Sequence, residues 1–288
     1  MSAPTRTPSV QVAGAPDPLG RDDFTRLAKF IFDTAGIKMP LNKITMLESR
    51  LRRRVRATGT TTIAGYCDWL FANDNLAEET TFLINAITTN KTDFFRESHH
   101  FDYLCDTILP SMKAAGRDHV RVWSAGCSTG AEPYTIAMLL DAFASDRRGP
   151  NYGILATDID TDVLAAARRG VFHADAINVV PPALRDRYVA FARASGRDEV
   201  RMVPDLRAAI GFARLNLMDA VYPVGDAMDL IFCRNVLIYF DRETQERVVR
   251  KLVARLRHGG HLFLGHAESI AGIDLPLLTV ANTVFQRT

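Results

Sequence analysis

The pattern of hydrophobic and polar positions divides the chain into two parts. Between residues 21 and 97, apolar side chains such as Phe24 and Leu27 recur at helical spacing, and no alternation typical of strands interrupts them. After Gly116, short apolar runs alternate with amphipathic stretches, which is the pattern of a parallel sheet wrapped by helices. We therefore predict a small all-α N-terminal domain at 21–97 and an α/β domain at 98–288.

The second part predicts a Rossmann-like, doubly wound sheet with an inserted small β-subdomain. The insertion is expected at about 171–211, where Pro181-Pro182 and a polar turn break the alternation. Two apolar runs around Asn282 suit a closing hairpin. Strands are expected at 120–125, 152–157, 210–215, 228–233 and 261–264, and helices at 134–143, 162–169 and 241–256, the last one ended by Gly259-Gly260.

Composition sets limits on this picture. The 47% hydrophobic content of the 288 residues is enough for a buried core. Residues 1–20 hold four prolines and no apolar stretch that suits a signal peptide, so we expect a flexible tail there. No run approaches the roughly 20 apolar residues that cross a bilayer. The four cysteines are scattered without a Cys-x-x-Cys pair, which favours reduced thiols in a cytoplasmic protein and argues against a metal site.

One turn carries the strongest local signal for a ligand. At 124–134 a glycine-bearing turn leaves an expected strand and enters a helix, and Gly126 would let a ligand approach bare backbone. The turn lacks the Gly-x-Gly-x-x-Gly dinucleotide pattern, and the chain has no phosphate-binding loop. The expected ligand is therefore an adenosine with an amino-acid tail. A tight connection with packing glycines is the alternative interpretation.

An acidic residue at the end of the next strand supports such a ligand. Asp158 follows the strand predicted at 152–157, where its carboxylate can accept hydrogen bonds from both ribose hydroxyls. Asp160 and Asp162 compete for this role. We expect Asp162 to be the N-cap of the following helix and Asp158 to be the ribose ligand.

Four strings of sequence resemble one family in their order and spacing. They are Thr89-Asn90-Lys91-Thr92-Asp93-Phe94-Phe95-Arg96, the turn at 124–134, Ala156-Thr157-Asp158-Ile159-Asp160 and Phe232-Cys233-Arg234-Asn235-Val236-Leu237-Ile238-Tyr239-Phe240. Over about residues 24–287 the chain resembles the CheR family of chemotaxis-receptor glutamate methyltransferases. The resemblance implies S-adenosylmethionine as cofactor, methyl transfer to glutamate side-chain carboxylates of a receptor, and S-adenosylhomocysteine as product.

The resemblance also implies roles for individual residues. Arg96 and Tyr239 match the pair thought to lie beside the reacting methyl group; a surface charge and a packed aromatic ring are the respective alternatives. A glutamate carboxylate is anionic at neutral pH and needs no general base to attack a sulfonium methyl group, so the site need only align two reactants and exclude water. Besides Gly126, the expected cofactor contacts are Asn90, Thr92, Arg96, Glu132, Asp158, Asn216, Leu217, Arg234 and Asn235.

A basic stretch predicts the partner. Residues 21–60 carry ten Lys or Arg against four Asp or Glu in a chain of net charge +2, which favours an acidic partner. Within 48–56 the arginines surround a helical apolar stripe, for which a solvated charged face is the usual explanation. In the family, the corresponding helix docks on acidic receptor helices. We therefore expect receptor contacts from Arg50, Arg53, Arg54 and Arg56, with Arg53 and Arg56 as the best candidates.

The inserted subdomain differs from that of some family members, which add the receptor's C-terminal pentapeptide to its sheet as a strand. Here the loop at 194–199 is shorter and less glycine-rich, so we expect an enzyme that needs no such tether. The absence of heptads and of a large apolar surface stripe leads us to expect a monomer.

Two other functions compete with this reading. A nucleic-acid methyltransferase would also use arginines, on phosphates. Against it, Arg234-Asn235-Val236-Leu237 stands where an Asn/Asp-Pro-Pro-aromatic string is typical of base amino methylation. A catalytically silent S-adenosylmethionine-binding adaptor would be expected to have lost some of the residues that are intact here, such as Arg96 and Tyr239.

Overall fold

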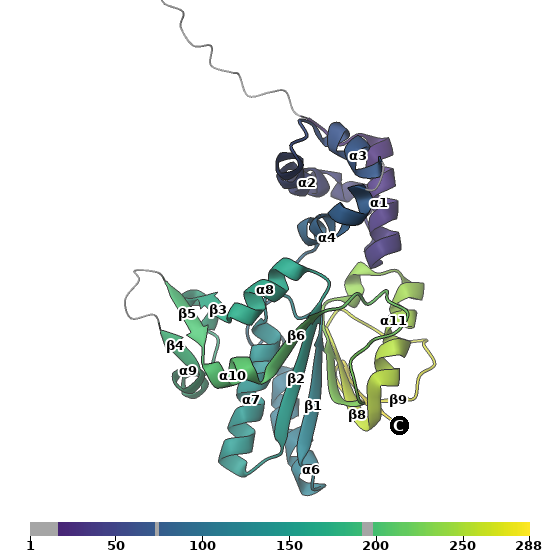
Figure 1. The fold of residues 1–288 in the computed structure, drawn as a ribbon. Helices are drawn as coiled ribbons and strands as arrows, with labels where there is room; N and C mark the ends of the chain where they lie inside the picture. Colours follow the sequence, from purple (N-terminus) through teal and green to yellow (C-terminus); the bar gives the residue numbers. More distant parts are fainter. Residues whose placement is uncertain (1–16, 73–74, 192–197) are drawn as a thin grey trace, which may run out of the picture. The chain divides into compact units, whose positions relative to one another are not determined.

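The computed structural model describes residues 17–72, 75–191 and 198–288 (Figure 1). Its contacts group the chain into two compact units. The first holds the described residues up to Phe30 together with Met39–Ile87, and the second holds Ile31–Lys38 together with Thr88–Thr288. The second unit thus begins before the predicted residue 98, because the side chain of Thr88 already hydrogen-bonds within the sheet domain.

The first unit is helical, in agreement with the all-α prediction. Helix α2 buries Leu47, Leu51 and Val55, which form the apolar stripe expected from the sequence. The stripe faces the domain core and leaves the arginines between its members nearer the surface. The helical elements are α1 (Arg21–Ala35), of which the residues from Ile31 onward belong to the second unit, the 3₁₀ turn η1 (Leu41–Lys43), α2 (Ile44–Thr58), α3 (Ile63–Phe71) and α4 (Asn75–Ile87).

Residues 17–20 differ from the flexible tail that the sequence predicted for 1–20. Leu19 is buried, and its backbone N–H donates to the carboxylate of Glu48 at 2.9 Å. The carboxylate of Asp17 accepts a hydrogen bond from the backbone N–H of Ile63. An apolar side chain and two hydrogen bonds thus attach this segment to the helical unit.

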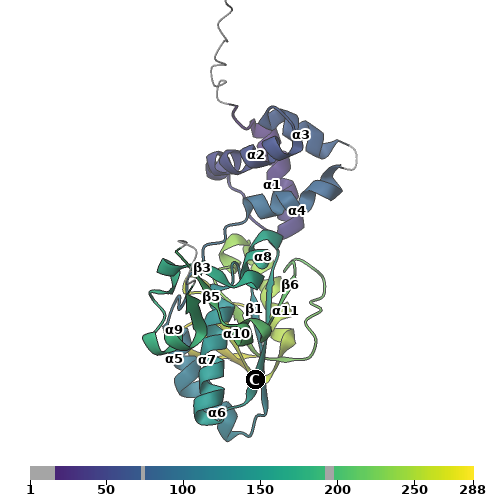
Figure 2. The same ribbon diagram turned by 60° about the vertical axis from the view of Figure 1, so that its left-hand side comes forward.

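A seven-stranded sheet forms the centre of the second unit (Figures 1 and 2). Its order is β6-β2-β1-β7-β8-β10-β9; the first five strands run parallel, and the hairpin of β9 and β10 is antiparallel. The parallel strands therefore all end at one edge of the sheet. Their bounds are β1 (His119–Ala125), β2 (Asn151–Asp158), β6 (Ile210–Arg214), β7 (Met228–Cys233), β8 (Leu256–Leu264), β9 (Leu277–Ala281) and β10 (Val284–Arg287).

Alternate residues of the strands enter two different cores, so both faces of the sheet are covered. In β7, Leu230 and Phe232 pack into one cluster with helices α5 to α8, whereas Ile231 and Cys233 pack into the other cluster with α11. This confirms the doubly wound architecture. The helical elements are α5 (His99–Tyr103), the π-helical η2 (Leu104–Ile108), α6 (Leu109–Ala114), α7 (Ala131–Arg147), α8 (Thr161–Arg169), the 3₁₀ turn η4 (Leu237–Tyr239) and α11 (Arg242–Arg255).

The prediction that Gly259-Gly260 end helix α11 is wrong. The helix ends at Arg255, and β8 begins directly at Leu256 with both glycines inside the strand. Gly259 has a φ of +75° near the start of β8, where the pairing register with β7 shifts, and such bulges favour glycine. A side chain at Gly260 would place its Cβ 3.0 Å from the carbonyl oxygen of Asp229. Both glycines are therefore required by the backbone geometry and packing of β8, and not by the end of α11.

The predicted insertion contains a small antiparallel sheet in the order β3-β5-β4. Most of the loop at 194–199, on which the tether-independent prediction rests, lies outside the described residues. No helix in the described part of the chain has both the length and the apolar character that a membrane span needs. The insertion comprises β3 (Val171–His173), the 3₁₀ turn η3 (Ala174–Ile177), α9 (Pro182–Tyr188), β4 (Val189–Phe191), β5 (Glu199–Met202) and α10 (Pro204–Ala208).

Candidate active site

Five loops leave the carboxyl ends of the parallel strands at one edge of the sheet, where open α/β sheets bind ligands. The loop after β1 begins at Gly126, and the loop after β2 holds Asp160. The loop after β6 begins with Leu215, and the loop after β7 begins at Arg234. The fifth follows β8. The strand order thus brings together residues from three of the four motifs, those at 124–134, 156–160 and 232–240.

Gly126 is required by its surroundings. Its φ is +81°, and a Cβ at this position would lie 2.4 Å from Cγ2 of Val236 in the loop after β7. Its N–H donates to the carbonyl oxygen of Thr157 at 2.8 Å. These contacts give Gly126 a packing role, which was the alternative interpretation of the turn; the approach of a ligand to it stays a prediction.

Asp158 and Asp160 are both buried but have different partners. The two carboxylate oxygens of Asp158 accept one backbone N–H each, from Ser128 at 2.8 Å and from Asp160 at 3.0 Å. Burial raises the pKa of Asp158, and these hydrogen bonds oppose the shift. Asp160, and not the predicted Asp162, is the N-cap of α8, because its carboxylate accepts the N–H groups of Asp162 and Val163.

The segment that follows α4 is attached to this edge by its own side chains. Nδ2 of Asn90 and Oγ1 of Thr88 both donate to Oδ2 of Asp160, each at 2.7 Å. The carbonyl oxygen of Asn90 accepts the hydroxyl of Ser128 at 2.7 Å. Asn90 therefore lies beside the loops after β1 and β2, as a cofactor contact would require.

Arg96 lies on a turn with an unusual backbone. Phe95 and Glu97, its neighbours on either side, have φ values of +53° and +57°, a region that non-glycine residues rarely adopt. Arg96 is half-buried as a residue, and its guanidinium donates to the carbonyl oxygen of Lys91 at 3.1 Å in an exposed hydrogen bond. Thr92, also half-buried, belongs to the same segment.

Arg234 joins this turn to the sheet. Its buried guanidinium lies 3.3 Å from Glu97 and 3.3 Å from Glu132, and it donates to the carbonyl oxygen of Arg96. Burial raises the pKa of Glu132, although the charge of Arg234 opposes the shift. Burial also acts to raise the pKa of Glu97, but the hydrogen bond from Asn235 and the charge of Arg234 outweigh it, so this pKa is lowered. Arg234 thus holds the turn that carries Arg96.

Sequence reasoning missed two carboxylates that hold Asn235. Asn235 has a φ of +60°; its Nδ2 donates to Glu97 at 3.1 Å, and its backbone N–H donates to Glu268 at 3.0 Å. Glu268 is buried and also accepts the backbone N–H groups of Leu237 and Gly265. No local pattern marks these contacts, since Glu97 and Asn235 are 138 positions apart.

The remaining predicted residues lie on the loops after β6 and β7. Nδ2 of Asn216 donates to the carbonyl oxygen of Thr34 at 2.7 Å, and Leu217 is buried. Tyr239 ends the turn η4, where its carbonyl oxygen accepts the N–H of Lys38 at 2.9 Å. The residue is half-buried, and its hydroxyl has no hydrogen-bond partner among the described residues.

The four arginines predicted to bind a partner have different surroundings in the first unit. Arg54 forms a two-pronged ion pair with the buried Glu79, at 2.6 and 2.8 Å. Arg50 donates to a backbone carbonyl oxygen at the end of α4. Arg53 and Arg56 are exposed. Arg54 and Arg50 thus have roles within the domain, and Arg53 and Arg56 remain the candidates for a partner.

Two family models match consecutive parts of the chain. The model described as "CheR methyltransferase, all-alpha domain" matches residues 22–88, and the model described as "CheR methyltransferase, SAM binding domain" matches residues 90–284. The junction between the two matches lies close to the start of the second unit at Thr88.

Curated relatives match over most of their own length. "Chemotaxis protein methyltransferase 2" of Pseudomonas aeruginosa is 36% identical over 283 residues, which cover 98% of this chain and 99% of that protein. The "Chemotaxis protein methyltransferase" of Salmonella typhimurium is 41% identical over 91% of this chain and 88% of that protein, and the one of Escherichia coli is 39% identical over 91% and 89%. The fold, the grouping of the motifs at one edge of the sheet and these matches together establish that the chain belongs to the CheR methyltransferase family.

Proposed function

We propose that this chain transfers the methyl group of S-adenosylmethionine to glutamate side-chain carboxylates of chemotaxis receptors, forming glutamyl methyl esters and S-adenosylhomocysteine. The observation that carries the proposal is that Asp158 ends β2 and that Asn235 and Tyr239 follow β7, at the same edge of the sheet, with β1 between the two strands. The segment of Arg96 is hydrogen-bonded to this edge. Relatives that match most of the chain are named chemotaxis protein methyltransferases, which supports the same function.

Two carboxylates, the buried Asp158 and the half-buried Glu132, suit the polar groups of the cofactor. The carboxylate of Asp158 accepts backbone N–H groups from Ser128 and Asp160, and its remaining acceptor capacity suits the ribose hydroxyls. Glu132, in the first turn of α7, accepts the hydroxyl of Ser124 at 2.7 Å and faces Arg234. Its remaining acceptor capacity suits an ammonium group at the amino-acid end of the ligand.

The proposed reaction requires alignment of two groups and no general base. The cofactor supplies an electrophilic methyl group on a sulfonium. The substrate carboxylate, ionised at neutral pH, forms a C–O bond to the methyl carbon as the C–S bond breaks, and a neutral thioether leaves. The guanidinium of Arg96 has donors beyond the one on Lys91, so it can orient a carboxylate of either reactant. The hydroxyl of Tyr239 is available to donate to the attacking oxygen.

The first unit is proposed to recognise the receptor. Arg53 and Arg56 are exposed neighbours at i, i+3 on α2, a spacing that suits an acidic helical surface. Arg50 and Arg54 would support this surface from within the domain. We further propose that the enzyme works in the cytoplasm, as a monomer and without binding a receptor pentapeptide.

Incubation of the purified protein with methyl-labelled S-adenosylmethionine and receptor-containing membranes tests this function. We expect label on the receptor that mild base releases as methanol, because carboxyl methyl esters are base-labile. Label on nucleic acid would support a nucleic-acid methyltransferase, and bound cofactor without transfer would support a silent adaptor. Either of these results contradicts the proposal.

A further inference from the structure

One buried carboxylate joins two loops of the candidate active site. Glu268, 6% exposed, lies in the turn after β8. Its Oε2 accepts the backbone N–H of Asn235 at 3.0 Å and that of Gly265 at 2.6 Å, and its Oε1 accepts the backbone N–H of Leu237 at 2.7 Å. A single side chain thus satisfies three backbone donors from the loops after β7 and β8.

These hydrogen bonds stabilise a stretch of backbone, from Asn235 to Leu237, that local structure stabilises poorly. Asn235 has a φ of +60°, in a region that L-residues rarely adopt. Leu237 opens the 3₁₀ turn η4, which ends at Tyr239, and the first N–H groups of such a turn have no partner within it. While Glu97 holds the side chain of Asn235, Glu268 holds its backbone. The carboxylate therefore fixes both ends of the segment that separates Asn235 from the turn of Tyr239.

Gly265 brings the two loops into close contact. A Cβ at this position would lie 2.6 Å from Nδ2 and 2.7 Å from the backbone nitrogen of Asn235. The backbone after β8 therefore packs directly on the residue predicted to bind the cofactor. Any shift of the turn that holds Glu268 must move Asn235 as well.

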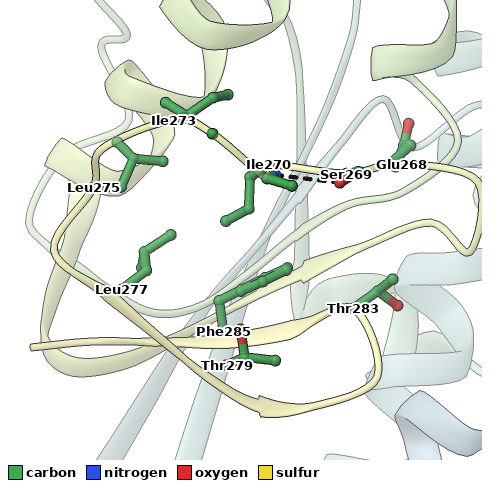
Figure 3. A pocket seen from close by; sticks show the side chains of 11 residues that line it. Glu268, Ser269, Ile270, Ile273, Leu275, Leu277, Thr279, Thr283 and Phe285 are labelled. Carbon is green, nitrogen blue, oxygen red and sulfur yellow. Dashed lines mark hydrogen bonds between the residues drawn. The ribbon is translucent and has the colours of Figure 1, made fainter.

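Glu268 also borders a cavity of about 450 Å³ between the loop that follows it and the hairpin of β9 and β10 (Figure 3). Figure 3 shows its carboxylate directed away from Phe285 and Thr279, which line the cavity. Its hydrogen bonds run instead to the loop after β7. The carboxylate therefore serves the active-site loop and not the cavity.

We propose that Glu268 is a positioning residue for methyl transfer, which holds Asn235 in its cofactor-binding conformation and sets the place of Tyr239. The inference rests on the proposed function, because these two residues matter to catalysis only if their loop binds the cofactor. Glu268→Gln replaces one acceptor oxygen with an NH2 group that faces a backbone N–H. The substitution keeps the size of the side chain and removes at least one of its hydrogen bonds.

The test compares Glu268→Gln with Asp229→Asn in the full chain. Asp229 serves as the control because, like Glu268, it is buried and accepts a backbone N–H, that of Arg121 at 2.8 Å, but lies at the opposite end of β7. Unlike Glu268, it also pairs with Arg117 and Arg257. Both variants should unfold at a lower temperature. We expect only Glu268→Gln to raise the Kd of S-adenosylhomocysteine and the KM of S-adenosylmethionine. Each should rise about tenfold, because hydrogen bonds to a carboxylate are lost. The KM of the receptor should stay unchanged.

Gly265→Ala gives a second test without a change of charge. Its methyl group would displace Asn235, so it should weaken S-adenosylhomocysteine binding in the same way, even if Glu268→Gln fails to fold. The inference is overturned if both site variants bind as tightly as the wild type, or if Asp229→Asn weakens binding as much as they do. A wild-type chain that binds no S-adenosylhomocysteine would instead defeat the proposed function itself.

Discussion

The two buried aspartates after β2 differ in how much of their hydrogen-bonding capacity is in use. The oxygens of Asp160 hold the first turn of α8 on one side and the segment of Thr88 and Asn90 on the other. Asp158 accepts backbone N–H groups, from Ser128 and Asp160. Asp160 is thus a structural residue, and Asp158 is the candidate for a ligand.

Asp158→Asn should weaken the binding of S-adenosylhomocysteine by about tenfold to a hundredfold, because it removes hydrogen bonds between a carboxylate and the ribose. Isothermal titration calorimetry with the wild type and the variant measures this effect. The 2′-deoxy analogue of the ligand is the control. Because it lacks one of the two hydroxyls, the substitution should reduce its affinity by a smaller factor. An equal loss of affinity for both ligands would contradict the ribose contact.

His100 should make the protein less stable in mild acid. The side chain is fully buried, and burial, with the charges of Arg234 and His99, lowers its pKa from 6.5 to about 4 against the opposing charge of Glu97. Between these two values the unfolded chain binds more protons than the folded chain, so the free energy of unfolding falls as the pH falls through this window. At neutral pH this contribution to stability is fully present.

Urea unfolding at about pH 7.5 and about pH 5 measures the effect. The variant His100→Gln should lose less stability than the wild type between the two conditions. The free energy of unfolding of the variant should still depend partly on pH, because burial also lowers the pKa of His261 to about 4. If the variant lost as much stability as the wild type between the two pH values, His100 would not be the group that titrates.

At the scale of elements, helix α2 combines a structural arginine with exposed ones. Arg54→Met should lower the free energy of unfolding by on the order of 3 kcal/mol, because it leaves the buried carboxylate of Glu79 without its cation. The same change at the exposed Arg53 should cost less than about 0.5 kcal/mol. Equal costs in denaturant unfolding would contradict the role of the ion pair.

The exposed arginines of α2 should affect the receptor and not the cofactor. Reversing the charge of Arg53 and Arg56 together should raise the KM of the receptor and leave the Kd of S-adenosylhomocysteine unchanged. The difference should shrink as salt is added, because these charges are screened. Reversing Arg121 and Arg250, which are exposed in the second unit, changes the net charge equally and serves as the control. An equal rise of KM in the control pair would exclude a specific surface on α2.

At the scale of the whole molecule, the sequence predicted most of the second unit because its strands are buried on both faces. All six residues of β7 are buried, and apart from Asp229 the segment 228–233 is apolar. The motifs follow such runs directly, which is why the sequence predicts Asp158 and Arg234 at strand ends. The small antiparallel sheet of the insertion was predicted from the break in the same alternation.

The rest depends on contacts between positions far apart in the chain, which one sequence does not reveal. Glu268 holds a loop more than thirty residues before it, and nothing near it in the sequence marks this role. The sequence does not distinguish Arg54 from the neighbouring arginines of α2, and only its contact with Glu79 in the structure does. The sequence led us to expect Asp162 as the cap of α8, and this was wrong because the helix starts at Thr161, which makes Asp160 the cap.

The central claim is that the edge of the sheet formed by these loops binds S-adenosylmethionine. Isothermal titration calorimetry of the full chain with S-adenosylhomocysteine tests it most directly, at two temperatures so that binding with little heat at one is detected at the other. We predict saturable binding of one ligand per chain, which excess S-adenosylmethionine abolishes by competition. The absence of saturable heat at both temperatures would contradict the account.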